Sequence, residues 1–127
     1  MDDALVTAAR SARTHAYCPY SGFAVGAALE TDDGRVFTGC NVENASYALT
    51  VCAERAAVLA AVAAGVRRFR RLVVVAEADP PVSPCGACRQ VMSELLADNA
   101  LIISCHSETE YRSWSIAELL PYPFLLS

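Results

Sequence analysis

Apolar residues recur at helical intervals near the start of the chain and again in its middle. The first helix is expected after Asp2 and Asp3, which can cap it, with an apolar face made of Leu5, Ala8, Ala9, Ala12 and Ala16. The segment from Cys52 to Ala64 is rich in Ala, Val and Leu, lacks proline and ends at Gly65. This pattern predicts a buried helix with a glycine C-cap.

Two further helices are expected in the second half of the chain. The proline-rich segment 79–84 is predicted to be irregular, and residues from Cys85 to Leu96 have helical character. Ser115-Ile116-Ala117-Glu118 matches a capping box, which indicates a short last helix before Pro121.

The other apolar segments are short and predict strands. Phe23–Glu30 and Val36–Gly39 flank Asp32-Asp33-Gly34, and Asp-Gly between two apolar runs is typical of an antiparallel β-hairpin. Further strands are expected at Leu72–Ala76, Leu101–Cys105 and Tyr111–Trp114. The alternation of strands and helices predicts an α/β fold in which helices cover a mixed sheet.

Length and composition indicate one apolar unit. With 127 residues, the chain is expected to form a single domain, residues 1–127. Hydrophobic residues make up 54% and charged residues 19%. This is more apolar than a typical small protein, and an oligomer that buries additional surface would explain the excess.

Charge and hydropathy exclude several classes of partner. The longest apolar stretch, Ala56–Val66, is well short of the roughly 20 residues that cross a bilayer, so no membrane span is expected. The opening Met1-Asp2-Asp3 has neither a basic nor an apolar secretory segment, which favours a cytoplasmic location. The net charge of −4 favours small substrates over nucleic acids.

Three of the six cysteines have the spacing of a catalytic zinc site. Cys85-x-x-Cys88 at a helix start would direct both sulfurs to one ion, and Cys52 would arrive from the start of another helix. Three protein ligands leave the fourth position of a Zn²⁺ ion free for water, with one zinc per chain. Helix N-termini favour the required thiolates, and Arg55 or Arg89 would offset their excess negative charge.

Glu54 is the candidate catalytic group. It follows Cys52 by two residues, close enough to face the zinc site without binding the ion. Deamination of cytosine needs protons delivered to ring N3 and to the departing ammonia, and one carboxyl group can shuttle both. A three-cysteine zinc site with a non-ligand glutamate is the established pattern of zinc-dependent nucleobase deaminases.

Other interpretations of these residue types remain open at this point. Cys-x-x-Cys by itself also fits structural zinc or redox chemistry. The remaining cysteines, Cys18, Cys40 and Cys105, lie in or beside apolar segments and are expected to be small core residues. His15 and His106 have no partner at ligand spacing and are expected to be structural.

Four blocks of sequence resemble the small homotetrameric cytidine deaminases, in the order of that family and between about Ala12 and Phe124. The blocks begin at Tyr17-Cys18-Pro19-Tyr20-Ser21-Gly22-Phe23, Gly39-Cys40-Asn41-Val42-Glu43-Asn44, Cys52-Ala53-Glu54-Arg55 and Ser83-Pro84-Cys85-Gly86-Ala87-Cys88-Arg89-Gln90. The resemblance implies a three-layer α/β/α sandwich with roughly five strands. It also implies zinc-dependent conversion of cytidine and 2′-deoxycytidine to uridine and 2′-deoxyuridine plus ammonia, in pyrimidine salvage.

The same resemblance implies a set of nucleoside contacts. Phe23 would stack on the pyrimidine, Asn41 and Glu43 would hold the ribose 3′-hydroxyl, and the Ala53 backbone would contact the base. Glu43 would also repel a phosphate. From the residues alone, an Asn-x-Glu at a strand end is usually a solvated turn, and Phe23 also fits a core position.

The resemblance further implies a homotetramer with shared active sites. Neighbouring subunits would contribute the backbone around Ala45, the side chain of Tyr47 and Phe124, whereas Arg55 and Gln90 would tune the zinc thiolates. Tyr122-Pro123 stands just before Phe124, where the family usually has small residues.

Two rival functions are compatible with parts of this pattern. A deaminase of a modified cytosine nucleoside or of a nucleoside antibiotic would share the zinc site, and the altered C-terminus favours such a change. A catalytically silent zinc module would share the cysteines, but the presence of Glu54 argues against it. A nucleic-acid deaminase is disfavoured by the acidic charge balance.

Overall fold

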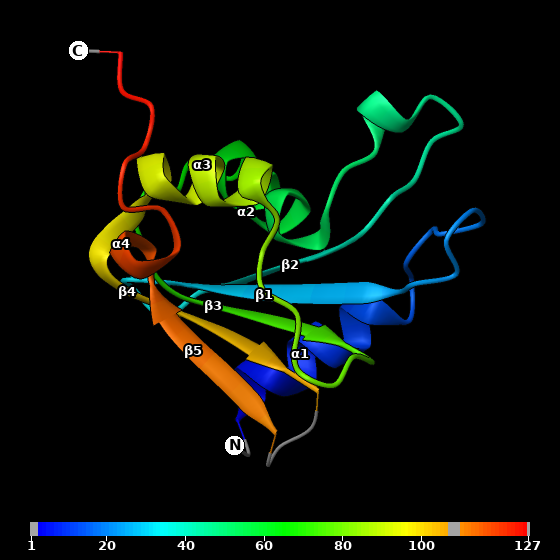
Figure 1. The fold of residues 1–127 in the computed structure, drawn as a ribbon. Helices are drawn as coiled ribbons and strands as arrows, with labels where there is room; N and C mark the ends of the chain where they lie inside the picture. Colours follow the sequence, from blue (N-terminus) through cyan, green and yellow to red (C-terminus); the bar gives the residue numbers. More distant parts are fainter. Residues whose placement is uncertain (1–2, 107–109, 127) are drawn as a thin grey trace.

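The fold is a five-stranded mixed sheet with helices on both faces (Figure 1). The structure is a computed structural model that describes residues 3–106 and 110–126. Its elements are α1 (Ala4–Arg13), β1 (Val25–Thr31), β2 (Val36–Cys40), the 3₁₀ turn η1 (Tyr47–Leu49), α2 (Ala53–Ala63), β3 (Phe69–Ala76), α3 (Gly86–Leu95), β4 (Leu96–Cys105), β5 (Tyr111–Ser115) and α4 (Ile116–Leu119).

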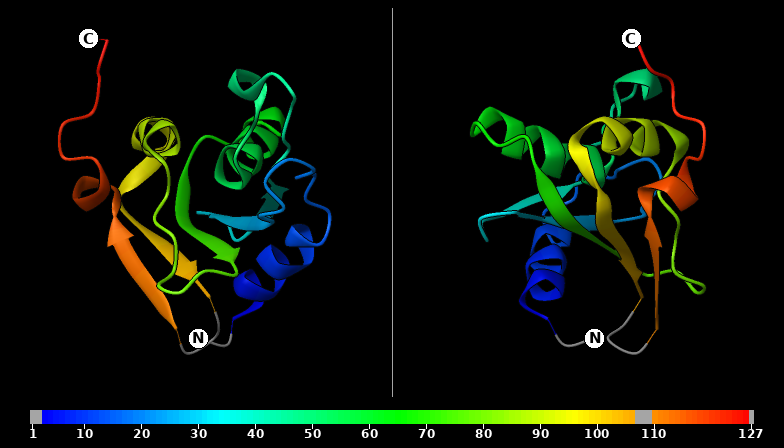
Figure 2. Two further views of the ribbon diagram at one scale, coloured as in Figure 1. Left: turned by 45° about the vertical axis from the view of Figure 1, so that its right-hand side comes forward. Right: turned by 90° about the vertical axis from the view of Figure 1, so that its left-hand side faces the viewer.

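The strands lie in the order β2-β1-β3-β4-β5, and only the β3–β4 pair is parallel. Successive residues of a strand point to opposite faces, so each strand contributes to two cores. On one face, Leu5 and Ala9 of α1 pack against Val73 and Ile103. The helices α2, α3 and α4 lie on the other side of the sheet from α1, as Figures 1 and 2 show. The second core lies beneath them. The expected α/β/α layering is confirmed.

The predicted hairpin is confirmed. β1 and β2 pair in antiparallel register from Gly26 opposite Cys40 to Glu30 opposite Val36. Gly34 closes the turn with φ +86°, a left-handed conformation that glycine adopts without steric cost. The expected strand start at Phe23 is wrong by two residues, because β1 begins at Val25 and Phe23 lies in the preceding loop.

The first helix is confirmed, with a shorter extent than its apolar pattern indicates. Asp3 caps it, since its carboxylate accepts a hydrogen bond from Leu5 N at 2.7 Å. Asp2, the other predicted cap, lies outside the described residues. The helix ends at Arg13, so Ala16 is not part of it.

The third and fourth strands begin earlier than their apolar runs indicate. β3 starts at Phe69 and includes Arg71, whose charge is paired with Asp3 at 2.7 Å and with Glu30 on the neighbouring strand. β4 starts at Leu96, where the sequence predicts the end of a helix. Cross-strand and cross-layer ion pairs therefore allow charged residues inside a strand that the hydropathy pattern does not mark.

Close packing between β2 and α2 positions the start of α2 over the sheet. A Cβ atom added to Gly39 would lie 2.4 Å from Ala57 N and 2.6 Å from Ala53 O, both in the main chain of α2. The absence of a side chain at this position is therefore what lets the helix approach the strand.

The start of α3 is joined to the C-terminal part of the chain. Arg89 donates from Nε to Pro84 O at 2.7 Å and from a terminal nitrogen to Leu119 O at 2.8 Å. The predicted capping box of α4 is present, with Ser115 and Glu118 bonded reciprocally. Of the helices in the described ranges, none has the length and apolar character needed to cross a membrane.

Candidate active site

A cavity of about 330 Å³ lies beside the N-termini of α2 and α3, at the end of the sheet where β1 begins. It brings together seven of the residues singled out from the sequence, namely Phe23, Asn41, Glu43, Cys52, Ala53, Glu54 and Cys85. These residues come from four separate segments of the chain. The cavity is therefore the place where the expected chemistry and the expected nucleoside contacts would meet.

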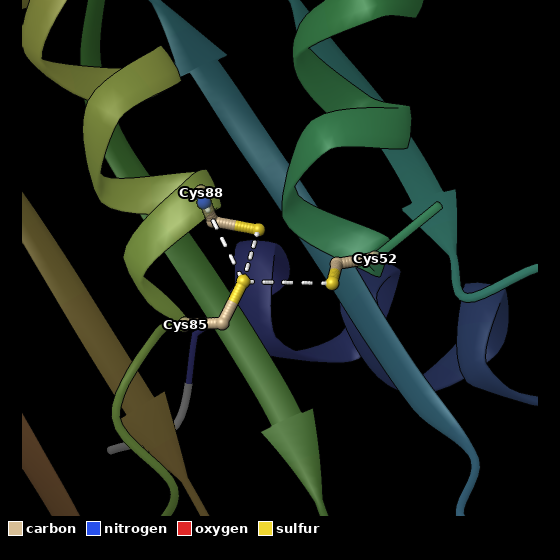
Figure 3. Close-up of side chains that lie close together, drawn as sticks. All are labelled: Cys52, Cys85 and Cys88. Carbon is tan, nitrogen blue, oxygen red and sulfur yellow. Dashed lines mark hydrogen bonds between the residues drawn. The ribbon is translucent and has the colours of Figure 1, made fainter. Parts of the chain in front are cut away.

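The three predicted zinc ligands converge, as Figure 3 shows. Cys52 is the N-cap residue of α2, and Cys85 is the N-cap residue of α3, one turn before Cys88. The Cys52 and Cys85 sulfurs are 3.7 Å apart, and those of Cys85 and Cys88 are 3.3 Å apart. Within the described residues, this is the cluster of potential ligands that could hold a metal ion.

The spacing of these sulfurs fits a zinc ion. Thiolates at about 2.3 Å from a tetrahedral Zn²⁺ stand roughly 3.8 Å from one another. All three sulfurs here lie within 4.8 Å of one another. The donor set of three cysteines also matches zinc, because soft thiolate ligands select it over magnesium or calcium.

The cluster is poised to bind a cation because one thiol is already acidic. A hydrogen bond with Cys88, opposed by burial and reinforced by Arg55, lowers the pKa of Cys52 to about 5. The same hydrogen bond, together with burial, raises the pKa of Cys88 well above its ordinary value. These shifts favour a thiolate at Cys52 and a protonated thiol at Cys88, and metal binding displaces protons from the ligand thiols.

Of the two arginines proposed to offset the thiolate charge, Arg55 is the one beside a sulfur. Its guanidinium donates to Cys52 Sγ at 3.5 Å and to Thr50 O at 3.3 Å. The guanidinium of Arg89 is instead directed to main-chain carbonyls of Pro84 and Leu119. Arg55 therefore faces the cysteine cluster, whereas Arg89 holds the segment that carries Cys85.

Glu54 lies in the first turn of α2 and lines the cavity. Only 5% of its surface is exposed. Burial raises the pKa of its carboxyl group, with the nearby Cys52 charge acting in the same direction. A raised pKa favours the protonated form of the carboxyl group, which a group that delivers protons needs.

The polar wall of the cavity is an ordered network. Asn41 accepts a hydrogen bond from Val25 N at 2.9 Å and donates one to Phe23 O at 2.8 Å. The Glu43 carboxylate accepts from Tyr20 N at 3.0 Å and from the amide and hydroxyl of Ser21. Phe23 is 40% exposed, so it is a wall of the cavity rather than a core residue.

Ala45, Tyr47 and Phe124 are not among the cavity-lining residues of this chain. Tyr47 is 72% exposed and its ring meets that of Tyr20 edge-on, with centroids 6.0 Å apart. Phe124 is 67% exposed. The assignment of these residues to a neighbouring subunit's site stays a prediction.

Gln90 forms hydrogen bonds with the main chain of Phe124, whereas the resemblance assigns it to the zinc thiolates. Its amide nitrogen donates to Phe124 O at 2.9 Å, and its amide oxygen accepts from Phe124 N at 3.1 Å. Gln90 thus attaches the C-terminal segment to the helix that carries Cys88. Its expected influence on the zinc thiolates stays a prediction.

Sequence reasoning did not single out several residues of the cavity: Ser21, Val25, Thr50, Val74, Val82 and Ser83. Ser21 is the one with a detectable signal, because a hydroxyl in a turn two residues before a candidate aromatic is well placed to bond the local main chain. Val74 and Val82 give no signal of their own, since apolar cavity residues look like core residues in a sequence.

The remaining cysteines behave differently from the zinc cluster. Cys105 is buried beneath α1, which confirms its expected place in the core. Cys18 and Cys40 are half-buried, and neither belongs to the metal cluster.

Comparisons with known proteins agree with the chemistry of the cavity. Residues 1–104 match the family model described as the cytidine and deoxycytidylate deaminase zinc-binding region. The chain is 46% identical to a cytidine deaminase from Sporosarcina psychrophila over 120 residues, which span 94% of this chain and 88% of that protein. It resembles a crystal structure of cytidine deaminase from Burkholderia pseudomallei with a TM-score of 0.92 and 51% identity, covering 98% and 100% of the two chains.

A more distant relative bears on substrate choice. A blasticidin-S deaminase from Bacillus cereus is 32% identical over 108 residues, which span 79% of this chain and 76% of that protein. The identity is lower than that to the Sporosarcina cytidine deaminase.

Proposed function

Because this chain belongs to the cytidine and deoxycytidylate deaminase family, we propose that it converts cytidine and 2′-deoxycytidine to uridine and 2′-deoxyuridine, with release of ammonia, in pyrimidine salvage. The observation that carries the proposal is the position of Glu54. Its buried carboxyl group lies in the same cavity as Cys52, Cys85 and the exposed ring of Phe23.

Cys52, Cys85 and Cys88 would hold one Zn²⁺ per chain. When bound there, zinc supplies the Lewis acidity that makes water a nucleophile near neutral pH. Glu54 takes a proton from the attacking water and delivers it to ring N3, which makes C4 electrophilic. It then carries a second proton to the departing amino group. Arg55 limits the negative charge of the cluster through its bond to Cys52.

The rest of the cavity would bind the nucleoside. The half-exposed ring of Phe23 offers an aromatic face to the pyrimidine, and the backbone of Ala53, which also lines the cavity, would contact the base. Asn41 and Glu43 would bind the ribose 3′-hydroxyl. The Ser21 hydroxyl holds the pKa of Glu43 below its usual range, so this carboxylate is charged at neutral pH and would disfavour nucleotides.

We further propose a homotetramer in which neighbouring subunits complete each site. Support comes from the surface of the chain, where Tyr47, Phe124, Leu125 and Leu126 are all strongly exposed. Large apolar side chains gathered on projecting segments are typical of subunit interfaces. The backbone around Ala45, together with Tyr47 and Phe124, would reach the neighbouring cavity, and Gln90 would hold the segment that carries Phe124.

The proposal is tested by a deamination screen of the purified zinc-loaded protein. Cytidine and deoxycytidine are expected to release ammonia much faster than cytosine, cytidine monophosphate or adenosine. Blasticidin S belongs in the same screen because a blasticidin-S deaminase is among the relatives of this chain. Turnover of that compound alone would establish the modified-nucleoside alternative instead.

Glu54→Gln separates catalysis from metal binding. The variant keeps the shape of the side chain and all three cysteines but loses the titrating carboxyl group, so zinc content is expected to stay at one per chain while turnover falls by at least about 1,000-fold. Zinc content by atomic absorption and ammonia release provide the two measurements. Wild-type turnover in this variant would contradict the shuttle.

A further inference from the structure

Ser21 joins the two parts of the cavity that would contact a nucleoside. It lies in the loop before β1 and lines the cavity. Its hydroxyl donates a hydrogen bond to Glu43 Oε2 and accepts one from Phe23 N at 3.0 Å. The residue therefore connects the aromatic wall directly to the carboxylate.

The hydrogen-bonding capacity of Glu43 is almost filled by this loop. An ionised carboxylate has about four lone-pair positions. Oε1 accepts from Tyr20 N at 3.0 Å and from Ser21 N at 3.2 Å, and Oε2 accepts from the Ser21 hydroxyl. One acceptor position remains, and it is on Oε2, the oxygen bonded to the Ser21 hydroxyl.

The direction of the Ser21 hydroxyl follows from its own partners. Because its oxygen already accepts the Phe23 amide hydrogen, its single hydrogen is free to point at Glu43. The chain of bonds runs from the Phe23 amide through Ser21 to Glu43. A change in any member would move the free lone pair of Oε2 relative to the ring of Phe23.

We propose that Ser21 is a positioning residue that orients the Glu43 carboxylate to accept a hydrogen bond from a single sugar hydroxyl, at a set distance from the ring of Phe23. The inference rests on the proposed function, because it assigns the selection of the sugar within the same cavity. Ser21 acts through Glu43 rather than by touching the reacting atoms.

Charge supports this geometry. The hydrogen bond from the Ser21 hydroxyl is the largest cause that lowers the pKa of Glu43, followed in the same direction by the amides of Ser21 and Tyr20. The carboxylate is therefore purely an acceptor at neutral pH. It suits a hydroxyl donor and opposes an anionic group such as a phosphate.

The loop has supports that do not depend on the Ser21 hydroxyl. Gly22 N donates to Cys18 O at 2.9 Å, and Asn41 holds Phe23 O and Val25 N through its amide. Removing the hydroxyl is therefore expected to disturb the orientation of Glu43 more than the fold of the loop.

The test compares Ser21→Ala with the wild-type protein on cytidine and on 3′-deoxycytidine, which lacks the hydroxyl that Glu43 would bind. Ser21→Ala is expected to raise the KM for cytidine about tenfold and to leave kcat within about twofold. The reason is that Glu43, without the hydrogen bond from the Ser21 hydroxyl, would no longer be oriented toward the 3′-hydroxyl. The KM for 3′-deoxycytidine is expected to change less than twofold. The preference for the 3′-hydroxyl therefore falls by roughly the same tenfold factor.

Two variants complete the design. Ser21→Thr retains a hydroxyl and is expected to keep most of the wild-type preference. Ser11→Ala is a matched control, since Ser11 is an exposed serine on α1, across the sheet from the cavity. If Ser21→Ala does not fold, Ser21→Cys replaces it and is expected to show the same loss of preference, because a thiol is a weak donor.

Equal losses on both substrates, or an unchanged preference, would overturn the proposal. If the wild-type protein deaminates no cytosine nucleoside, the proposed function fails, and Ser21 is then judged by a ¹³C NMR titration of the Glu43 carboxyl. Removal of the hydroxyl is expected to raise the pKa of Glu43. An unchanged pKa would refute the role of Ser21 whatever the substrate.

Discussion

Cys52 combines a structural and a chemical role in one side chain. As the N-cap of α2 it lies where the helix dipole favours a negative charge, and Arg55 donates to its sulfur. Its pKa of about 5 means that the thiolate is present at neutral pH without any cost of deprotonation. Metal binding must still displace a proton from Cys88, whose pKa is raised.

Substitution of Cys52 is expected to remove the metal and stability together. Cys52→Ala leaves two sulfurs, which do not hold zinc tightly, and the free energy of metal binding contributes to folding. We expect less than about half of a zinc per chain and a lower thermal midpoint in zinc-containing buffer. Cys105→Ala is the control, because Cys105 lies beneath α1 on the other face of the sheet. Full zinc content in Cys52→Ala would mean that another residue is the third ligand.

At the scale of the secondary-structure elements, the main chains of β2 and α2 come into close contact at Gly39. Because a Cβ atom there would lie within 2.6 Å of two main-chain atoms of α2, Gly39→Ala must push the helix away from the strand. We expect a loss of about 1–3 kcal/mol in the free energy of unfolding, together with weaker zinc binding as Cys52 moves. Urea unfolding and zinc titration measure the two effects.

Gly86→Ala is the matched control for this packing argument. A Cβ atom at Gly86 would meet no atom within 4 Å, and alanine favours the helix that begins there. Its free energy of unfolding is expected to equal or slightly exceed that of the wild type. Similar losses in both variants would show that the close contact at Gly39 is not what matters.

The β1–β2 hairpin should show a pH dependence of its own. The Thr31 hydroxyl, followed by Arg35, lowers the pKa of Asp33 from an ordinary value of 3.8 to about 2. A carboxyl group with a depressed pKa stabilises the folded state above its unfolded pKa, and this contribution is lost as the pH falls through the folded value. The window is therefore from about pH 4 down to about pH 2.

Asp33→Asn isolates this effect, because it removes the charge and keeps a hydrogen-bond acceptor. The wild type is expected to have the higher urea midpoint at pH 5, and the two proteins should converge as the pH approaches 2. If the difference in urea midpoint between the two proteins stays constant across this pH range, the stabilisation comes from the shape of the side chain rather than from its charge.

In the molecule as a whole, two segments extend away from the packed layers. Figure 1 shows the η1 segment and the C-terminal segment projecting beyond the helices. They carry Tyr47 and Phe124, both strongly exposed. Gln90 attaches the second segment to α3 by two hydrogen bonds, which links the position of Phe124 to the helix that carries Cys88.

Mixed oligomers would test the proposed sharing of sites between subunits. Glu54→Gln and Phe124→Ala subunits are each expected to have low activity alone. When refolded together, some sites would combine an intact Glu54 with an intact Phe124 from the neighbour, so ammonia release should exceed the sum of the separate samples. A mixture with only additive activity would mean that each chain completes its own site.

Local motifs were sufficient to predict that Cys52 and Cys85 stand at helix starts, that Glu54 lies in the first turn of one of these helices, and where the hairpin and most helices lie. The physical reason is that a cap, a turn or two residues on one helical turn are related by short sequence separation, so their geometry follows from backbone conformation. The resemblance to a known family added Phe23, Asn41 and Glu43, and the cavity contains all three. The hydrogen bonds that these three residues form could not be predicted from the sequence.

The tertiary structure decided which distant segments meet. It directed Arg89 to Leu119 and Gln90 to Phe124, and brought Ser21 against Glu43, 22 positions away. Each outcome depends on strand order and on how closely helices approach the sheet, which no local pattern encodes. Spacing along the chain therefore specified the chemistry of the site, whereas packing between layers specified the network that would orient a substrate within it.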